Sequence, residues 1–262
     1  MSSRPEPEEV YRDLASREEQ PFTQKRKKAV EDSIARLQQP IPEDSLIIHA
    51  LDNVHELDTI INTLSSRLRN WYSLYGPEIS AAFKENREFA QRVLEQEKDA
   101  LLAETHQQHD TGGSLSDQDL AAIRQQASQV LALFASRDAL VEYIEKKLQE
   151  GMPNLYALAT PMIAASLISA AGSLSRLSRL PGSAIQILGA EDALFRHIHS
   201  NAPPPKYGIL LSHPLVMKAA RKEQGKMARR VANSMAIAAR ADYYASSTTL
   251  GAELLAKLRE DT

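Results

Sequence analysis

A group of basic residues late in the chain has the types and spacing to contact phosphate groups. Gln224-Gly225-Lys226 opens its most basic part, and Lys226, Arg229 and Arg230 recur at spacings that put them on one face of a helix or on its flank. The opposite face is core-like and consists of Met227, Val231, Met235 and Ala238. Further basic residues of the segment are Lys218, Arg221, Lys222 and Arg240. A merely solvated basic face is the alternative.

The distribution of charge favours phosphate contact over that alternative. The net charge is −3, but residues 43–150 carry 10 basic and 19 acidic groups, whereas residues 151–240 carry 11 basic and 3 acidic groups. Residues 1–42 are balanced at 8 and 8, and residues 241–262 carry 2 and 4. An acidic middle followed by a basic part indicates a polyanionic partner for one half of the chain only.

A glycine before a predicted helix marks a second candidate site. In the segment Gly189-Ala190-Glu191-Asp192, the glycine would leave the amides of the first helical turn free and close to a ligand, which suits phosphate binding. Arg196 follows one turn later on the same helix. An ordinary helix start is an equal alternative, because acidic residues in a first turn also complement the helix dipole.

A proline run marks a third candidate. Pro203-Pro204-Pro205 precedes Lys206, Tyr207 and Gly208, and its stiffness would fix the direction in which Lys206 projects. Rigid presentation lowers the entropy cost of binding a ligand. A rigid connector with an exposed lysine explains the same residues equally well.

Other residues give little sign of catalysis, metal binding or cofactor binding. His106 and His109, beside Asp110, could supply half of a metal site, but the sequence places no third ligand. No serine or carboxylate accompanies His197, His199 or His213 at a recognisable spacing, so a structural or RNA-facing role is favoured over a general base. The chain has no cysteine, which excludes disulfides and thiolate chemistry. We therefore predict a protein that is not an enzyme and holds no metal or cofactor.

Two long heptad-like seams predict the scaffold that positions these residues. The first runs at steps of three and four, ends at Gly76-Pro77, could be capped by Asp44 or Ser45, and comprises Ile47, Leu51, Val54, Leu57, Ile61, Leu64, Leu68, Trp71 and Tyr75. The second could be capped by Asp117 and comprises Ile123, Ala127, Val130, Phe134, Arg137, Val141, Ile144 and Leu148. We expect the two helices to pair antiparallel, with Arg137 paired to a carboxylate or reaching solvent.

The predicted domains follow from these seams. Residues 1–43 are predicted to be a tether that could include a short helix, and residues 44–150 an antiparallel coiled coil with a helical tip insertion over about residues 77–116. Residues 151–262 should form a globular helical domain, with a buried helix between Asn154 and Ser175 and a last long helix from about Glu223 to Tyr244. The fold class is thus all-α. No apolar stretch reaches the roughly 20 residues that span a bilayer, and the start has no signal-peptide core, so a cytoplasmic protein is expected.

Several motifs, taken in order, resemble the Nop family of box C/D ribonucleoprotein core proteins, archaeal and eukaryotic. Leu68-Arg69-Asn70-Trp71-Tyr72 resembles the first coiled-coil helix, and Pro153-Asn154-Leu155 the junction to the Nop domain. The stretch from Leu180 to Arg196, which includes Gln186 and Gly189-Ala190-Glu191, resembles the Nop signature. Pro204-Pro205-Lys206-Tyr207-Gly208 and Gly225-Lys226-Met227-Ala228-Arg229 follow in the family's order.

The resemblance implies a function in RNA binding. It implies a coiled coil that dimerises, with itself or with a paralogue, and a Nop domain that recognises a kink-turn RNA together with its small ribosomal-type protein. RNA ribose methylation and rRNA processing would depend on a separate methyltransferase. The residues expected to face the RNA are Gly189, Ala190, Arg196, Lys206, Gln224, Gly225, Lys226, Arg229 and Arg230.

Two departures from the family pattern qualify these expectations. The family commonly has lysine where this chain has Asp192, so one phosphate contact would become a repulsive carboxylate. Only about 43 residues precede the coil, so the family's amino-terminal domain, which holds fibrillarin, is expected to be lacking, and this counts against fibrillarin recruitment. The alternative function is a coiled-coil protein-interaction scaffold that has lost RNA binding and methyltransferase recruitment.

Overall fold

The computed structural model describes residues 23–34, 40–106, 111–200 and 202–260, and these residues form helices and loops without a β-strand. Residues 1–42 and 43–262 are two separate units. In the first unit, residues 23–34 form a helix in which every residue is exposed. The remainder of the predicted tether up to residue 39 lies outside the described residues. The predicted all-helical class is confirmed.

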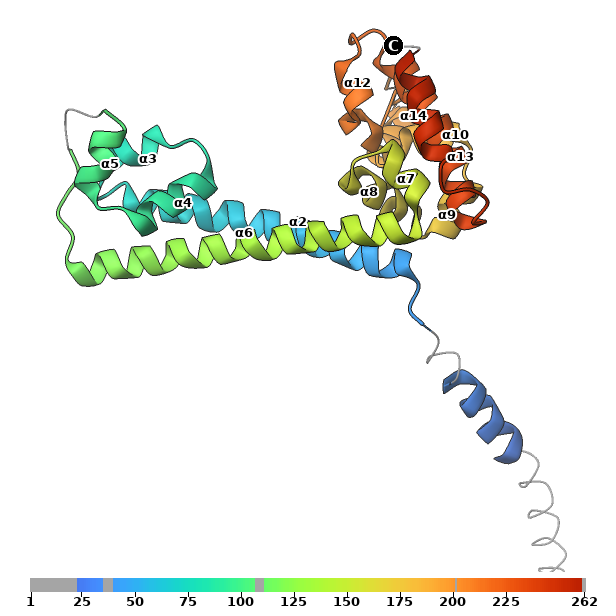
Figure 1. The fold of residues 1–262 in the computed structure, drawn as a ribbon, viewed down its shortest axis with the longest axis horizontal. Coiled ribbons are helices and arrows are strands. Elements are labelled where there is room, and N and C mark those ends of the chain that lie inside the picture. The colour runs from blue at the N-terminus through green and yellow to red at the C-terminus, as the bar shows by residue number, and fades with distance from the viewer. Residues whose placement is uncertain (1–22, 35–39, 107–110, 201, 261–262) are drawn as a thin grey trace, which may run out of the picture. The chain divides into compact units, whose positions relative to one another are not determined.

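The second unit is built on a long helical hairpin. Helix α2 (Glu43–Tyr72) and helix α6 (Asp117–Gly151) lie side by side along their length (Figure 1). They run antiparallel, because Glu43 pairs with Lys147 at one end while Asp58 pairs with Arg137 further along. At 1.5 Å per residue, the 30 residues of α2 span about 45 Å. The helices therefore carry the globular domain and the tip region at opposite ends of a rod.

Most of the predicted seam is buried between the two helices. The fully buried members are Ile47, Leu51, Val54, Ile61, Leu68, Ile123, Ala127, Val130, Ile144 and Leu148, and the half-buried apolar members are Leu57, Leu64, Tyr75, Phe134 and Val141. The prediction was wrong for Trp71, which is 39% exposed, whereas its neighbour Tyr72 is 3% exposed. Tyr72 is covered because it meets the rings of Tyr75 and Phe89 edge to face. These contacts, and not the apolar spacing, decide which of the two aromatic residues is buried.

The helix caps differ from those expected. The cap of α6 is Ser116, not Asp117, because the Ser116 hydroxyl accepts the Asp119 amide while the Asp119 carboxylate accepts back from Ser116. Asp44 is the second residue of α2, where its carboxylate accepts the amide of Leu174 at 2.8 Å from the start of a later helix. Asp44 therefore ties the hairpin to the globular domain.

The single charged residue in the seam, Arg137, pairs with a carboxylate as predicted, since its Nε lies 2.9 Å from Asp58 Oδ1. Both side chains are partly exposed, at 32% and 44%, so solvent screens the pair. In a double-mutant cycle of Arg137→Ala and Asp58→Ala, we expect a coupling free energy below about 1 kcal/mol in denaturant unfolding. A coupling above about 2 kcal/mol would show that the pair fixes the register of the hairpin more strongly than its exposure allows.

A small helical tip closes the hairpin. It contains α3 (Pro77–Ala82), α4 (Asn86–Glu95) and α5 (Lys98–Glu104), packed around Phe89, Val93 and Leu101. Arg69 from α2 holds the loop before α4, because its guanidinium donates to the carbonyls of Ser80 and Phe83 at 2.8 and 2.7 Å. The insertion predicted over about residues 77–116 is thus helical up to Glu104 and then runs as a loop to α6, apart from residues 107–110, which lie outside the described residues.

The globular domain follows α6 after a break at Met152. Its helices are α7 (Pro153–Leu158), α8 (Pro161–Ala171), α9 (Leu174–Arg179), α10 (Gly182–Ile187), α11 (Glu191–Ser200), η1 (Ile209–Ser212), α12 (Pro214–Lys218), α13 (Gln224–Tyr243) and α14 (Leu250–Glu260). The single helix predicted between Asn154 and Ser175 is wrong, because Pro161 stops the chain from continuing α7 and begins α8 instead. Its predicted burial holds for Leu155, Ala164 and Leu167.

One hydrophobic core joins this domain to the base of the hairpin. It contains Leu51 and Leu148 from the hairpin together with Leu167 from α8 and Met235 from α13. The predicted domain boundary at residues 150/151 therefore lies within a continuous core. No helix in the described residues is long and apolar enough to span a membrane.

A polar network holds α7, α13 and α14 together at the point where the chain leaves α6. The carboxylate of Asp242 accepts the amides of Asn154 and Leu155 at 3.0 and 2.9 Å and the Asn154 side-chain amide at 2.7 Å. The fully buried Asn154 in turn donates to the carbonyl of Ser247 and accepts the amide of Gly251. These bonds connect α7, α13 and α14, because Asn154, Asp242 and Gly251 lie on these three helices in turn.

Candidate nucleic-acid interface

The turn between α10 and α11 requires glycine at position 189. Gly189 has φ of +81°, and a Cβ there would lie 2.5 Å from Cγ1 of Ile209. The amide of Ile209 donates to the carbonyl of Leu188 at 2.8 Å, which holds the two chain segments together. The turn is thus fixed against the segment that follows the proline run.

The two amides just before α11 already have internal partners. The amide of Gly189 donates to Glu191 Oε1 at 2.8 Å, and the amide of Ala190 donates to the carbonyl of Ile187 at 2.9 Å. The prediction concerned the amides of the first turn of α11, which begins at Glu191, and it stays a prediction. The side chain of Glu191 folds back as the acceptor of the Gly189 amide.

Gln186 holds the segment after the proline run against the start of α13. Gln186 Nε2 donates to the carbonyl of Lys206 at 2.7 Å and to the carbonyl of Gly225 at 3.3 Å, and the Tyr207 hydroxyl donates to Gln224 at 3.3 Å. A Cβ on Gly225 would lie 3.6 Å from the Cβ of Lys206. The structure thus brings together Lys206, Gln224 and Gly225, and sequence spacing alone could not predict their proximity.

The first turns of α13 present the basic face predicted from the sequence. Met227, Ala228 and Val231 are buried, whereas Lys226 and Arg229 are exposed and Arg230 is half-buried. Lys226 lies 3.8 Å from Glu223, a loose contact between side chains that are 77% and 61% exposed. Such a pair leaves most of the lysine's charge available to a ligand.

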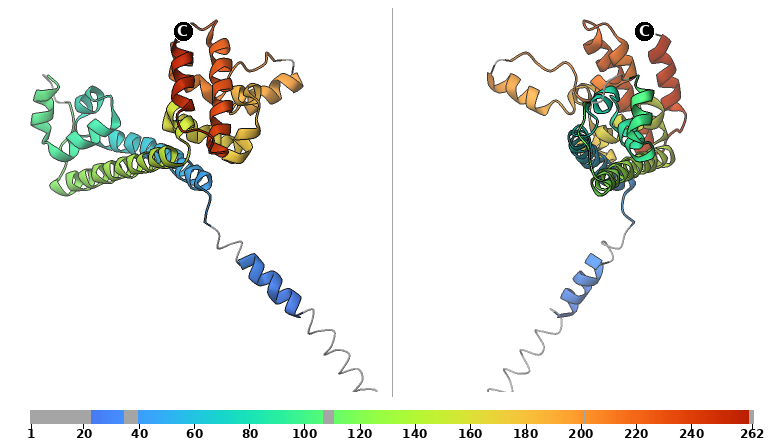
Figure 2. Two further views of the ribbon diagram at one scale, coloured as in Figure 1. Left: turned by 45° about the vertical axis from the view of Figure 1, so that its right-hand side comes forward. Right: turned by 90° about the vertical axis from the view of Figure 1, so that its left-hand side faces the viewer.

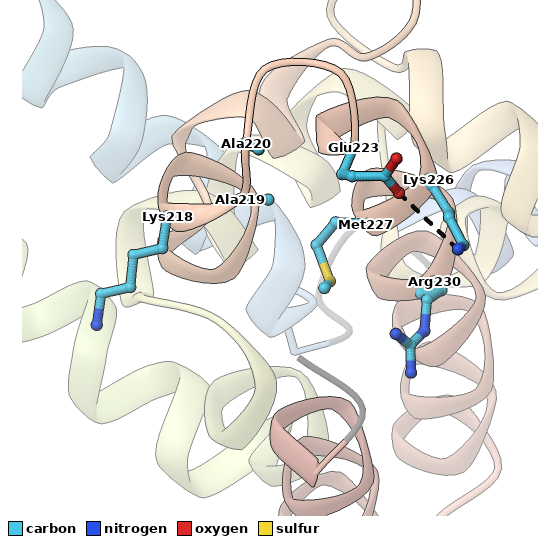
Figure 3. Close-up of a pocket in the computed structure, with 7 residues that line it drawn as sticks. All are labelled: Lys218, Ala219, Ala220, Glu223, Lys226, Met227 and Arg230. Atoms are coloured by element: carbon cyan, nitrogen blue, oxygen red, sulfur yellow. Dashed lines mark ion pairs between the residues drawn. The ribbon is translucent and has the colours of Figure 1, made fainter.

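A hollow lies beside this basic face. Its volume is about 290 Å³. In Figure 3 the side chain of Met227 extends from α13 into the space below the loop, and Lys226 and Arg230 lie on one side of α13. Lys218 borders the hollow from α12 and points away from Lys226. The lining residues are Lys218, Ala219, Ala220, Glu223, Lys226, Met227 and Arg230. This shape and charge suit an anionic surface better than a small enclosed substrate.

Helix α11 projects from the domain with its connecting loop (Figure 2). None of its residues is buried, and Phe195 and Ile198 are 62% and 67% exposed. Arg196 lies on this helix, and its Nε donates to the carbonyl of Asp192 at 3.3 Å. Arg196 is therefore presented on a separate arm instead of beside Lys226. The carboxylate of Asp192 is exposed near the start of that arm.

The histidines of the domain have structural contacts. His213 is 2% exposed, its Nε2 contacts the carbonyl of Leu158 at 2.8 Å, and its Nδ1 accepts the amide of Leu215 at the start of α12. Burial lowers the pKa of His213, although the contact with Leu158 opposes the shift. His197 Nδ1 contacts the carbonyl of Ala202, and the ring of His199 lies 4.1 Å from that of Phe195.

The possible half metal site near the hairpin tip falls partly outside the described residues. His106 lies two residues after the end of α5 and has a positive φ of 53°, while His109 and Asp110 are not described. Within the described ranges, no three histidine or carboxylate side chains come together as metal ligands.

Comparison with known proteins agrees with this geometry. The fold and the site define a class of all-helical proteins in which a long antiparallel hairpin carries a helical domain with a basic face. The family model described as Nop, "snoRNA binding domain, fibrillarin", matches residues 53–262. The chain belongs to the Nop family.

Relatives in the family come from archaea and eukaryotes. An uncharacterized NOP5 family protein of Methanocaldococcus jannaschii is 37% identical over 235 residues, which cover 83% of this chain and 56% of that protein. Probable nucleolar protein 5-2 of Arabidopsis thaliana is 36% identical, covering 82% and 44%, and nucleolar protein 56 of Caenorhabditis elegans is 34% identical, covering 78% and 47%. The chain spans about half the length of these relatives.

A solved structure shares the fold. The chain in the crystal structure of a fibrillarin/Nop5p complex aligns with a TM-score of 0.53 at 22% identity, covering 99% of this chain and 87% of that one. This likeness supports the arrangement of hairpin and globular domain.

Proposed function

We propose that this protein is an RNA-binding scaffold subunit of a box C/D-type guide ribonucleoprotein. It recognises a kink-turn RNA together with a small ribosomal-type protein bound to that RNA, and it performs no chemistry itself. Ribose methylation is carried out by a separate methyltransferase. The observation that carries the proposal is the assembly of Lys206, Gly225 and Lys226 into one surface, within a chain that belongs to a family described as snoRNA-binding.

The chemistry of this surface suits the RNA backbone. Lys226 and Arg229 are exposed cations on one helix end, and Lys206 is held beside them by Gln186. Cations at fixed positions bind phosphates and set orientation, whereas sequence readout needs contacts to base edges. Gly189 and Ala190 take part through the close approach of their backbone, since their amides have internal partners. Arg230 borders the surface from the next turn of α13. Arg196 contacts the RNA separately, from the arm formed by α11.

The hairpin supports dimerisation with a second Nop-type subunit, either another copy or a paralogue. Its middle leaves apolar residues incompletely covered, including Leu57, Leu64 and Phe134, and Ile60 and Tyr143 are 42% and 38% exposed. Covering such residues is favourable, at about 25 cal/mol per Å² of apolar surface removed from water. A partner lying along the hairpin would bury them.

The salt dependence of RNA binding tests the surface. We expect the variant Lys226→Glu, Arg229→Glu to lose affinity for a kink-turn RNA carrying its small protein, and the slope of log affinity against log salt to fall by about two because two phosphate contacts are lost. The matched control Arg67→Glu, Lys84→Glu makes the same change of charge on exposed residues of the hairpin and its tip. Equal losses in both variants would mean that net charge, and not this surface, governs binding.

A second candidate function is a scaffold that binds proteins only. Two observations favour it: Glu191 occupies the amide of Gly189, and Asp192 places an exposed carboxylate beside the turn. Both repel phosphate. A binding constant that barely changes between low and physiological salt would support this candidate over RNA recognition.

A further inference from the structure

Two exposed tyrosines stand at the carboxyl end of α13. Tyr243 and Tyr244 are 41% and 69% exposed, and their ring centroids lie 4.9 Å apart at an interplanar angle of 78°. Large aromatic rings on a surface lose little conformational entropy on binding and present flat faces to a ligand. The core of the domain does not use these faces, so their exposure calls for another role.

Three arginines lie on α13 and on α9, the helix that packs against it. Arg240 donates to the carbonyls of Ser178 and Leu180 at 3.1 and 3.3 Å, which fixes its guanidinium at the end of α9. Arg179 donates to the Ser175 hydroxyl at 2.8 Å, and both side chains hydrogen-bond the Tyr243 phenol, which lowers the pKa of Tyr243. Arg176 is exposed on the same helix. We name this surface the Tyr-Arg patch, comprising Arg176, Arg179, Arg240, Tyr243 and Tyr244.

The elements that carry the patch pack against each other. Helix α9 lies beside the end of α13 in Figure 1, and Figure 2 shows the same arrangement after rotation. The hydrogen bonds of Arg240 and Arg179 therefore hold the tyrosines and arginines in fixed relative positions. A preformed surface of this kind binds without the cost of ordering its own side chains.

Basic residues outnumber acidic residues on the two helices that carry the patch. The chain has no acidic residue from 151 to 190. Two carboxylates contact the elements next to the patch: Asp242 accepts the amides of Asn154 and Leu155, and Asp44 accepts the amide of Leu174 at the start of α9. A positive field beside exposed aromatic rings is the combination found in surfaces that bind unpaired nucleotides.

We propose that the Tyr-Arg patch binds single-stranded RNA, with unpaired bases stacked on Tyr243 and Tyr244 and phosphates contacted by Arg176 and Arg179. Every base has a π-face, so such contacts tolerate different sequences. The patch lies 17 residues along α13 from Lys226, about 26 Å at 1.5 Å per residue. It is therefore a separate site from the surface around Lys226, and its existence does not depend on kink-turn recognition.

Fluorescence anisotropy with the full chain tests the proposal. The probe is a fluorescein-labelled RNA of twelve uridines, which stays unpaired, and the comparison probe is a fully paired RNA duplex of equal length. We expect the single strand to bind more tightly than the duplex, and Tyr243→Ala, Tyr244→Ala to weaken the single strand by about tenfold or more. Tyr243→Phe, Tyr244→Phe keeps the rings and should retain most of the binding.

Three outcomes would overturn the proposal. The alanine variant could bind the single strand as the wild type does, or the phenylalanine variant could be as weak as the alanine variant. The variant Lys226→Glu, Arg229→Glu could abolish single-strand binding by itself, which would place that binding at the other end of α13. Circular dichroism of each variant checks that the helices are retained, and the exposure of both tyrosines makes that the expected result.

Discussion

Replacing Asp242 with alanine is expected to lower the free energy of unfolding by about 3 kcal/mol, because the side-chain amide of the fully buried Asn154 loses one of its two acceptors. The backbone amides of Asn154 and Leu155 at the start of α7 lose the same partner. Chemical denaturation followed by circular dichroism measures the change. Asp242→Asn keeps one acceptor oxygen and should lose less stability. An alanine variant that unfolds at the wild-type midpoint would contradict the role of this network.

The difference in unfolding free energy between the wild type and Asp242→Ala depends on pH in a defined direction. Burial raises the pKa of Asp242 above its ordinary value, while the hydrogen bonds from Leu155 and Asn154 oppose the shift. The folded state therefore binds the proton more tightly than the unfolded state, and ionisation of this group reduces stability. As pH falls through the folded pKa toward the ordinary value, the stability advantage of the wild type over Asp242→Ala should increase. Below the ordinary value the advantage should become constant.

Replacing Gly189 with alanine is expected to have an effect of similar size. Alanine is strained at φ of +81°, and its Cβ would lie 2.5 Å from Ile209 Cγ1, so the turn and the segment after the proline run must separate. Together these effects should destabilise the domain by about 3 kcal/mol. Because Lys206 precedes Ile209 by three residues, RNA affinity should also fall. Thermal unfolding and the RNA titration measure the two effects on one protein.

The matched control is Gly225→Ala. A Cβ there would meet Lys206 at 3.6 Å, an ordinary van der Waals distance, and Gly225 lies in the first turn of α13. Alanine is the better helix former by about 1 kcal/mol, so stability should stay level or rise. If Gly189→Ala had an unfolding temperature as high as that of Gly225→Ala, the turn at Gly189 would not be strained by a Cβ.

The hairpin could be predicted from sequence because its signal is periodic. Apolar residues at steps of three and four identify the faces of α2 and α6 that meet, and they are independent of distant parts of the chain. The pattern failed at Trp71, where the tip helices cover Tyr72 instead. It failed also at Pro161, which divides one apolar stretch into α7 and α8. In both places a specific contact or a backbone restriction outweighed apolar spacing.

The candidate site was only partly predictable. Lys206, Lys226 and Arg229 stood out by charge, but their proximity depends on Gln186, whose side chain bonds two carbonyls far apart in sequence. Gln186 carries no chemical signal of its own, so only its place within the Nop-like motif could have drawn attention to it. The hydrogen bond from the Gly189 amide to Glu191 depends on the rotamer of the Glu191 side chain, which sequence spacing does not determine. Helix α14 went unpredicted: Thr249 stands directly before it as a possible cap, but Gly251 in its first turn is a poor helix former.

The most direct test of the central claim is a gel-shift titration on a kink-turn RNA, with and without the small kink-turn-binding protein. We expect the wild type to shift the RNA-protein complex at concentrations where naked RNA stays free, because the recognised surface is composite. We expect the Lys226→Glu, Arg229→Glu variant to lose that shift. Equal binding to the naked kink-turn RNA and to its complex with the small protein, or no binding to either, would contradict kink-turn recognition by this protein.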